Sequence, residues 1–299
     1  MSSDTNGQTS DSMSNLACLV TVAISLVGIV VLAYLGGHQQ IDGALMQLAV
    51  VAVAIQWVAF LPAVMWRTEM FYDIVGSATF IVLVWAAVYL KPSGPLTTPQ
   101  VIPACLVTVW ALRLATFLGR RIKKVGKDGR FDDIKTNGIK FFMSWTLQAL
   151  WNFLTALPVL LVILAPDGPE GVGSIHMIGW SIWLLGFCIE VIADRQKSIF
   201  RARGDSASRW IDTGLWARAQ HPNYFGEITL WTGLFIAGTS TYAGGEWVAS
   251  IAPVFVYILL TRISGIPMLR ARAQARWGDN PEYQAYMAKT PMLLPLGRR

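Results

Sequence analysis

The sequence predicts an all-α fold, a polytopic membrane bundle of about seven or eight transmembrane helices. Hydrophobic residues make up 54% of the 299 residues and charged residues only 14%, whereas roughly a quarter of a soluble domain is charged. Apolar stretches of about 20 residues, the length that crosses a bilayer as a helix, recur along the chain. Lys and Arg gather in alternate loops between them, as in membrane proteins. A single soluble core is therefore excluded.

The apolar stretches give eight candidate spans. They cover residues 16–35, 44–66, 71–90, 100–119, 140–165, 174–195, 223–240 and 246–268. The stretch WRTE marks the short break between the second span and the third, and the seventh span is short, so seven or nine spans stay open. We expect one helical membrane domain over 16–268, followed by a C-terminal segment over 269–299. Residues 1–15 are polar and lack the basic residues of a signal peptide, which predicts a disordered tail.

Loop charge predicts the orientation. Basic segments follow the fourth, sixth and eighth spans, and the other loops are not basic. Because positive loops stay on the cytoplasmic side, these segments and both termini are predicted to face the cytoplasm. The net charge of +6 follows from this pattern, and no nucleic-acid partner is expected. The cysteines Cys18, Cys105 and Cys188 lie in apolar runs without metal-ligand spacing, so neither disulfides nor a zinc site is expected.

Arg113 is a charged residue within the fourth span. A charge in the bilayer costs on the order of 3 kcal/mol, and Arg113 shares a helix face with Trp110 and Phe117. Either Arg113 is functional, or it reaches toward the interface or forms a structural ion pair.

The sixth span ends with Glu190, Asp194, Lys197 and Arg201 on one helix face. This gradient from acid to base suits a ligand with a polar end and anionic phosphates. A helix end joined by salt bridges is the alternative.

The stretch ARAQHPNYFGE places His221, Asn223, Tyr224 and Glu227 beside the seventh span. Pro222 is suited to begin a helix there, and free N–H groups at a helix start attract phosphate or carboxylate. The alternative for His221 is a helix cap. A metal site is not expected, because His38 and His176 are predicted to lie on the other side of the membrane.

Polar residues elsewhere fit two interpretations. In the fifth span, Gln148 and Asn152 lie one turn apart, which favours hydrogen bonding between helices. Between the second and third spans, Glu69 and Tyr72 form an acid–phenol pair that could donate a proton, although a plain interfacial turn explains them too. The chain has no GxGxxG, P-loop, HExxH or GxSxG motif, so a Rossmann fold is not expected.

Three motifs carry a resemblance. ADRQKSIFR, WARAQHPNYFGE and RWGDNPEYQAY together resemble the C-terminal half of the steroid 5-alpha-reductase-like superfamily, which includes the delta-14 sterol reductases. FYDIVGSATFI and KDGRFDDIK are similar to its uncharacterised bacterial branch, so the resemblance covers nearly the whole chain.

The resemblance implies an NADPH site. Lys197, Arg201 and Trp216 would hold the adenosine phosphate end, and the C-terminal segment would cap the site. The implied cofactor residues are Asp194, Lys197, Arg201, Trp216, His221, Asn223, Tyr224, Glu227, Arg270 and Tyr286.

The resemblance also implies hydride transfer to a C=C bond of a lipophilic, steroid-like, sterol-like or enone substrate from the bilayer. This would be an NADPH-dependent oxidoreductase of the CH–CH group, in a bacterial inner membrane rather than the endoplasmic reticulum. The implied catalytic residues are Glu69, Tyr72 and Arg113. Trp110 stands where the 5-alpha-reductases have a tyrosine, which speaks against a 3-oxo-steroid.

Two alternatives stay open. A membrane methyltransferase of the isoprenylcysteine carboxyl methyltransferase type shares the fold and an HPxY-like motif but uses S-adenosylmethionine. QKSIFR and Asn223 favour the reductase, because the extra phosphate of NADPH requires Lys and Arg. A lipid-binding protein without turnover is the second alternative.

Overall fold

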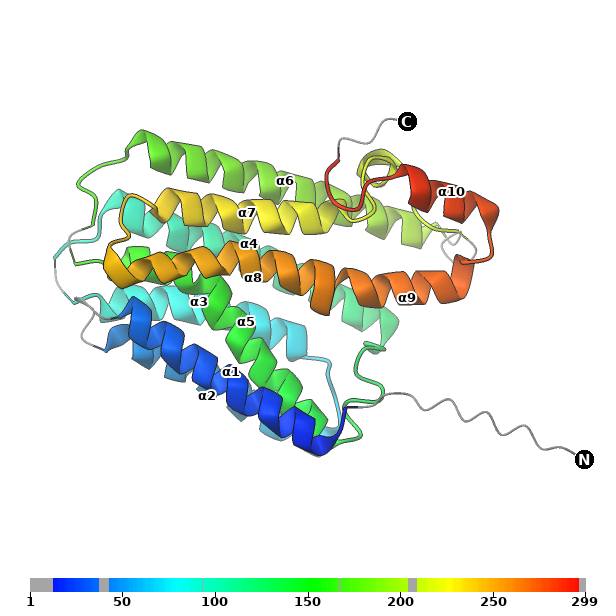
Figure 1. Ribbon diagram of the computed structural model, residues 1–299, viewed down its shortest axis with the longest axis horizontal. Coiled ribbons are helices and arrows are strands. Elements are labelled where there is room, and N and C mark those ends of the chain that lie inside the picture. Colours follow the sequence, from blue (N-terminus) through cyan, green and yellow to red (C-terminus); the bar gives the residue numbers. More distant parts are fainter. Residues whose placement is uncertain (1–12, 38–42, 93, 167, 204–208, 296–299) are drawn as a thin grey trace, which may run out of the picture.

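The computed structural model describes residues 13–37, 43–92, 94–166, 168–203 and 209–295, and these residues form helices and loops without a strand (Figure 1). Residues 1–12 of the predicted tail and His38 lie outside the described residues. The α-helices are α1 (Asn15–Gly36), α2 (Ala44–Trp66), α3 (Tyr72–Leu90), α4 (Thr98–Val125), α5 (Gly138–Leu164), α6 (Ser174–Ala202), α7 (Pro222–Gly238), α8 (Ile251–Ile258), α9 (Ile266–Trp277) and α10 (Pro281–Lys289).

The predicted fold class is confirmed. Within the described residues, seven helical segments are long and apolar enough to cross a membrane. The last of them, Gly244–Trp277, joins the 3-10 turn η3 (Gly244–Ser250), α8, the π-turn η4 (Leu259–Ile263) and α9. Helix α7 has 17 residues and lies alongside α6 (Figure 1). Every predicted span therefore corresponds to a helix.

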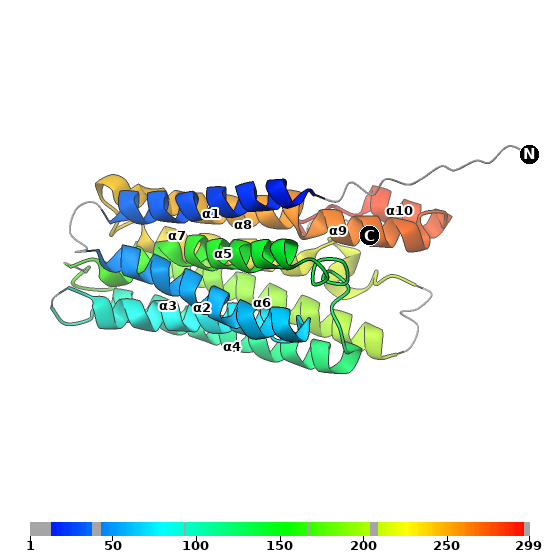
Figure 2. The same ribbon diagram turned by 90° about the horizontal axis from the view of Figure 1, so that it is seen from below.

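Helices α4 and α6 extend beyond the predicted spans, to Val125 and Ala202. Their last turns carry basic residues, which stabilise a helix C-terminus through the helix dipole. The ends of α4 and α6 lie at the same end of the bundle as α9, α10 and the start of α1 (Figures 1 and 2). We call this the α10 end. All three basic segments of the sequence thus lie at one end.

Helix α5 is the centre of the bundle. In an apolar stretch of 18 residues within α5, 83% of the residues are buried, against 39% or less in the other six membrane-spanning segments. Buried amides join it to its neighbours: Gln56 donates to Asn152 (3.2 Å) and to Thr79 (2.8 Å), and Asn152 donates to the Gly76 carbonyl (2.8 Å). Gln148 donates to the Tyr72 carbonyl (3.2 Å). The predicted hydrogen bonding between helices by Gln148 and Asn152 is confirmed.

Four glycines allow α6 and α7 to pack backbone to backbone. Gly179 and Gly186 of α6 face Gly233 and Gly226 of α7, and a Cβ at any of the four would lie 2.5–2.6 Å from the opposite backbone. Small residues are the usual means of close helix packing in membranes. This contact fixes the polar ends of α6 and α7 relative to each other.

Candidate cofactor site and active site

A large cavity opens at the α10 end. Its volume is about 1230 Å³, and its walls come from α4, α6, the turn η2 (Gly214–Ala217), α9 and α10. Ligand pockets usually measure roughly 300–1,000 Å³, so this cavity has room for more than one small molecule. Eight predicted site residues line it: Arg113, Asp194, Lys197, Arg201, Trp216, His221, Arg270 and Tyr286.

Lys197 and Trp216 form one wall of the cavity. The Lys197 ammonium lies 4.6 Å from the centroid of the Trp216 indole, a cation–π distance. Arg201, one turn further along α6, makes no hydrogen bond or ion pair with any described residue. Lys197 and Arg201 therefore present two positive charges to the cavity, and neither forms an ion pair with a described carboxylate.

Gln196, the residue before Lys197, positions Trp216. The Gln196 side chain accepts a hydrogen bond from the Leu215 amide (2.9 Å), and the Trp216 indole donates to the Ala193 carbonyl (3.1 Å). Gly214 packs against Gln196 and has a φ of +62°, a conformation that favours glycine. In the QK pair of the motif, Gln196 thus holds the loop and Lys197 faces the cavity.

The C-terminal segment is attached to this wall. Tyr286 donates its hydroxyl hydrogen to the Trp216 carbonyl (2.8 Å), and burial raises the pKa of Tyr286, so the hydroxyl keeps that hydrogen. Gln220 donates to the carbonyls of Met287 (3.1 Å) and Thr290 (2.6 Å). Arg270 reaches the Gln220 side chain at 3.5 Å. These bonds hold α10 beside the cavity.

His221 precedes the first turn of α7, which begins at Pro222 as predicted. Its ring stacks on Tyr224 at 5.7 Å between centroids. Its Nδ1 is buried and has no hydrogen-bond partner in the described part of the chain. Burial, then the charges of Lys197 and Arg270, lower the pKa of His221 to about 3. His221 is therefore neutral, with one ring nitrogen available to a ligand.

Arg113 lies at the deep end of the cavity and pairs with two carboxylates of α6, Glu190 and Asp194. Trp110 also donates to Glu190 (3.1 Å). Since Trp110 is completely buried and packs on Phe80 and Trp231 at 5.2 and 5.1 Å, its indole serves the helix packing. Arg113 is thus a membrane-embedded cation held between α4 and α6.

Asn223, Tyr224 and Glu227 do not line the cavity. They lie on the first turns of α7, and all three are half-buried. Glu227 follows Gly226, where an added Cβ would lie 2.9 Å from the Glu190 Cβ. Glu227 lies close enough to Glu190, Asp194 and Arg113 to interact with them electrostatically.

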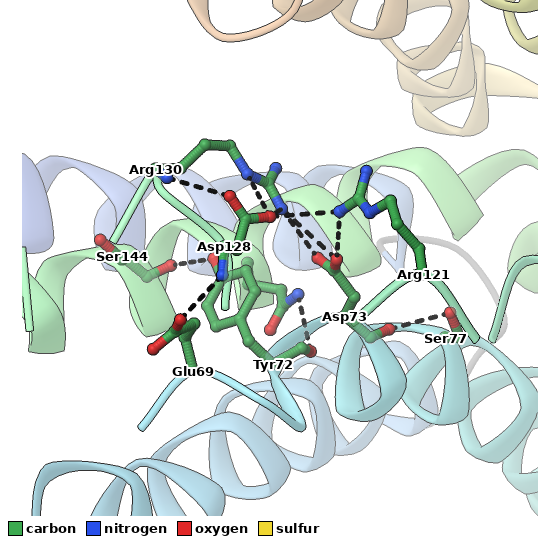
Figure 3. Close-up of polar contacts among 9 residues, drawn as sticks. Glu69, Tyr72, Asp73, Ser77, Arg121, Asp128, Arg130 and Ser144 are labelled. Carbon is green, nitrogen blue, oxygen red and sulfur yellow. Dashed lines mark hydrogen bonds and ion pairs between the residues drawn. The ribbon is translucent and has the colours of Figure 1, made fainter. Parts of the chain in front are cut away.

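Glu69 and Tyr72 are not brought to Arg113. Glu69 accepts hydrogen bonds from the Lys135 ammonium (2.8 Å) and the Asp128 amide (2.9 Å); burial works against ionisation, but these two bonds hold the pKa of Glu69 below its usual value. The Tyr72 hydroxyl donates to the Ser144 carbonyl (2.8 Å) (Figure 3). They line a separate pocket of about 10 Å³, room for one water molecule. The three predicted catalytic residues therefore do not share one surface.

A four-residue ion cluster lies beside Tyr72 (Figure 3). Asp73 and Asp128 both pair with Arg121 and with Arg130, at 2.7–3.2 Å. Arg121 also lines the large cavity, so the cluster ties the cavity wall to the α4–α5 loop. No local sequence pattern marks this cluster, because Asp73 lies 48 residues from Arg121 and 57 residues from Arg130.

The fold and the cavity define the class of protein, a polytopic helical membrane protein with a cation-lined cavity at one end. The family described as "Protein of unknown function (DUF1295)" matches residues 57–290. The chain belongs to this family, which is part of the steroid 5-alpha-reductase-like superfamily.

A curated relative is also similar in part. The chain is 31% identical to 3-oxo-5-alpha-steroid 4-dehydrogenase 1 of Macaca fascicularis over 101 residues, which are 34% of each protein. The match thus spans about a third of the length of that relative. No solved structure matches the chain. Family and relative agree with the predicted resemblance, and the protein is a steroid-reductase-like membrane protein.

Proposed function

We propose that this protein is an NADPH-dependent reductase of a C=C bond in a lipophilic steroid-like, sterol-like or enone substrate. One observation carries the proposal: Lys197 and Arg201, which form no ion pair with a described residue, line a cavity of about 1230 Å³ together with Trp216. A phosphate on the ribose is the feature that distinguishes NADPH from NADH, and charged groups of this kind recognise it. The volume leaves space for a substrate beside the cofactor.

The residues present fit the cofactor. Lys197 and Arg201 would hold the ribose phosphate, and the Trp216 indole offers an aromatic face next to them. The buried Nδ1 of His221, which lacks a partner among the described residues, would hydrogen-bond a polar group of the same molecule. Arg270 and Tyr286 would close the site from the C-terminal segment. When bound, NADPH supplies the hydride.

Arg113 provides the electrostatic part of the chemistry. As hydride adds to one carbon of a conjugated C=C bond, negative charge passes to the carbonyl oxygen, and a cation placed there stabilises it. The Arg113 guanidinium lies on the cavity wall with 17% of its side chain exposed. A proton from water at the α10 end then completes the addition at the other carbon. Glu69 and Tyr72 would act on the fold and not on the substrate.

The orientation follows from charge. The three basic segments lie at the α10 end (Figure 2), where the cavity opens, and positive loops stay on the cytoplasmic side. We propose that the protein lies in a bacterial inner membrane and that the cavity opens on the cytoplasmic side. NADPH is available in the cytoplasm.

Nucleotide titration of the detergent-purified protein tests the function. We expect NADPH to bind more tightly than NADH, with S-adenosylmethionine not binding. The double change Lys197→Ala/Arg201→Ala should weaken NADPH by about a hundredfold, the loss of two charge-assisted hydrogen bonds, and should affect NADH far less.

Arg203→Ala is the matched control. Arg203 is an exposed cation two residues beyond Arg201 and does not line the cavity, so NADPH affinity should not change. Equal weakening of NADPH and NADH by the double change would remove the phosphate role. Binding of S-adenosylmethionine in place of NADPH would replace the reductase with a methyltransferase.

A further inference from the structure

A row of four residues on α4 forms one edge of the cavity. Leu112, Thr116, Arg120 and Lys124 follow at intervals of four residues, all line the cavity, and all are exposed. At 1.5 Å per residue the row is about 18 Å long. It changes from an apolar residue at the depth of Arg113 to two cations at the α10 end.

Helix α6 repeats this change on the opposite edge. Val191, Arg195 and Ser198 line the cavity there, and Arg195 is exposed. The ion pairs of Arg113 with Glu190 and Asp194 join α4 to α6. The space between the two rows, which we call the α4–α6 groove, thus has an apolar deep part and a cationic mouth.

The cations that line the cavity outnumber the negative charges of the cofactor. NADPH carries about four negative charges, counting its ribose phosphate at up to two, and Lys197, Arg201 and Arg270 are assigned to it above. On α4 and α6, Arg120, Lys124 and Arg195 remain, and none of them forms an ion pair or hydrogen bond with a described residue. Asp194 is the one carboxylate among the described cavity residues, and Arg113 holds it. The mouth of the groove therefore suits a second anion.

We propose that the α4–α6 groove admits an anionic amphiphile, a lipid with a phosphate or carboxylate head group, as the substrate. Its head group binds Arg120, Lys124 and Arg195, and its chain lies along Leu112 and Val191. Arg113 is seven residues before Arg120, so the reducible bond lies about 10 Å from the head group. This inference rests on the reductase proposed above, whose substrate it specifies.

The exposed edges of both rows support entry from the bilayer. Leu112 is 55% exposed, and Ile192, next to Val191, is 47% exposed. Exposed apolar side chains on a membrane helix contact lipid tails, whereas long cationic side chains near a helix end reach the lipid head groups. An amphiphile in the membrane would therefore enter with its hydrocarbon chain beside the apolar side chains and its head group beside the cationic side chains.

Three lipid probes that share the farnesyl hydrocarbon chain and differ in their head group test the proposed head-group site. Radiolabelled farnesyl phosphate, farnesoic acid and farnesol are bound to the full chain in nanodiscs of neutral phosphatidylcholine, with and without NADP⁺. We expect the phosphate or the acid to bind at least about tenfold more tightly than the alcohol, as charge-assisted hydrogen bonds require. The first two probes show which anion the groove prefers. Equal affinity for all three would overturn the proposal.

Two neighbouring lysines provide a matched pair of variants. Lys124→Gln and Lys123→Gln remove the same charge from adjacent exposed positions, but only Lys124 lines the cavity. Lys124→Gln should reduce the preference for the anionic probe by about fivefold, and Lys123→Gln should leave it unchanged. An equal loss in both variants would show a general surface charge and would overturn the groove.

NADPH binding to the same samples separates this inference from the proposed function. If Lys124→Gln weakens NADPH and leaves the lipid preference intact, the groove cations belong to the cofactor and the inference fails. If the wild-type protein binds no NADPH but still prefers the anionic lipid, the reductase fails and the groove stands as a lipid site.

Discussion

The backbones of Gly186 in α6 and Gly226 in α7 touch: a Cβ on Gly226 would lie 2.6 Å from the Gly186 carbonyl oxygen. One turn beyond Gly186, Glu190 begins the polar face that continues to Asp194 and Arg201. His221 precedes Gly226 at the start of α7. The glycine contact therefore sets how the two helices that carry most of the candidate site meet.

Gly226→Ala should destabilise the protein. The new methyl group would lie 2.6–2.9 Å from the backbone and Cβ of α6, closer than real contacts, so the helices must separate. Overpacking of this kind costs about 1–3 kcal/mol. We expect a lower Tm in detergent together with weaker NADPH binding, because the polar ends of α6 and α7 move.

Gly28→Ala is the control for this change. A Cβ at Gly28 in α1 meets nothing within 4 Å, so the same substitution should leave the Tm unchanged or raise it slightly through helix propensity. A Gly226→Ala protein as stable as the Gly28→Ala protein would show that α6 and α7 do not require the close contact.

Arg113→Met should abolish reduction and lower stability. Removing the guanidinium leaves Glu190 and Asp194 without their cation, and breaking one side of a buried ion pair costs about 3–5 kcal/mol. The triple change Arg113→Met/Glu190→Gln/Asp194→Asn removes all three charges and should recover much of the Tm. Measured rates of NADPH oxidation with an enone lipid should remain at background in both. Activity in the triple variant would remove Arg113 from the chemistry.

Much of the fold could be predicted because its signals are local. Apolar runs of span length, and basic residues that follow them, are read directly from the sequence, and the helix that starts at Pro222 was predicted from proline geometry. The extensions of α4 and α6 were missed, because charged residues continue a helix without continuing its hydropathy. The sequence pattern marks where the membrane ends and not where the helix ends.

The candidate site was predictable where its residues lie on one helix. Asp194, Lys197 and Arg201 share a face of α6, and all three line the cavity. Whether Glu69 lies near Arg113 could not be predicted from the sequence, because it depends on how the α2–α3 turn packs. Lys135, which donates a hydrogen bond to the Glu69 carboxylate, lies 66 residues away along the chain. No local sequence pattern marks such a contact. Arg120 and Lys124 of the α4 row belong to the basic segment after the fourth predicted span, and there they were attributed to loop charge.

Glu69→Gln should lower the Tm without weakening NADPH. The amide cannot replace the carboxylate that Lys135 and the Asp128 amide bind, a loss of about 1–3 kcal/mol. Burial tends to raise the pKa of Glu69, but these hydrogen bonds hold it below its usual value. The ionised carboxylate therefore stabilises the folded protein at a pH above the usual pKa of a glutamate. The Tm difference should therefore shrink as the pH falls and the wild-type carboxyl is protonated.

Glu170→Gln, an exposed acid of the α5–α6 loop, should change neither quantity. If Glu69→Gln kept its full Tm yet lost enone reduction, Glu69 would be the catalytic acid after all, and the pocket it shares with Tyr72 would have to open to the substrate.

His221→Gln should make stability less dependent on pH. Burial and the charges of Lys197 and Arg270 lower the pKa of His221 from 6.5 to about 3 in the folded protein. Between these values the unfolded chain binds a proton that the folded chain does not, so folding loses about 1.4 kcal/mol per pH unit as the pH falls. Unfolding free energies at pH 7.5 and 5.5 should therefore differ by about 1.4 kcal/mol more in the wild type than in the variant. Parallel pH profiles would mean that the pKa of His221 is the same in the folded and the unfolded protein, and the buried neutral ring assigned to the cofactor would then be wrong.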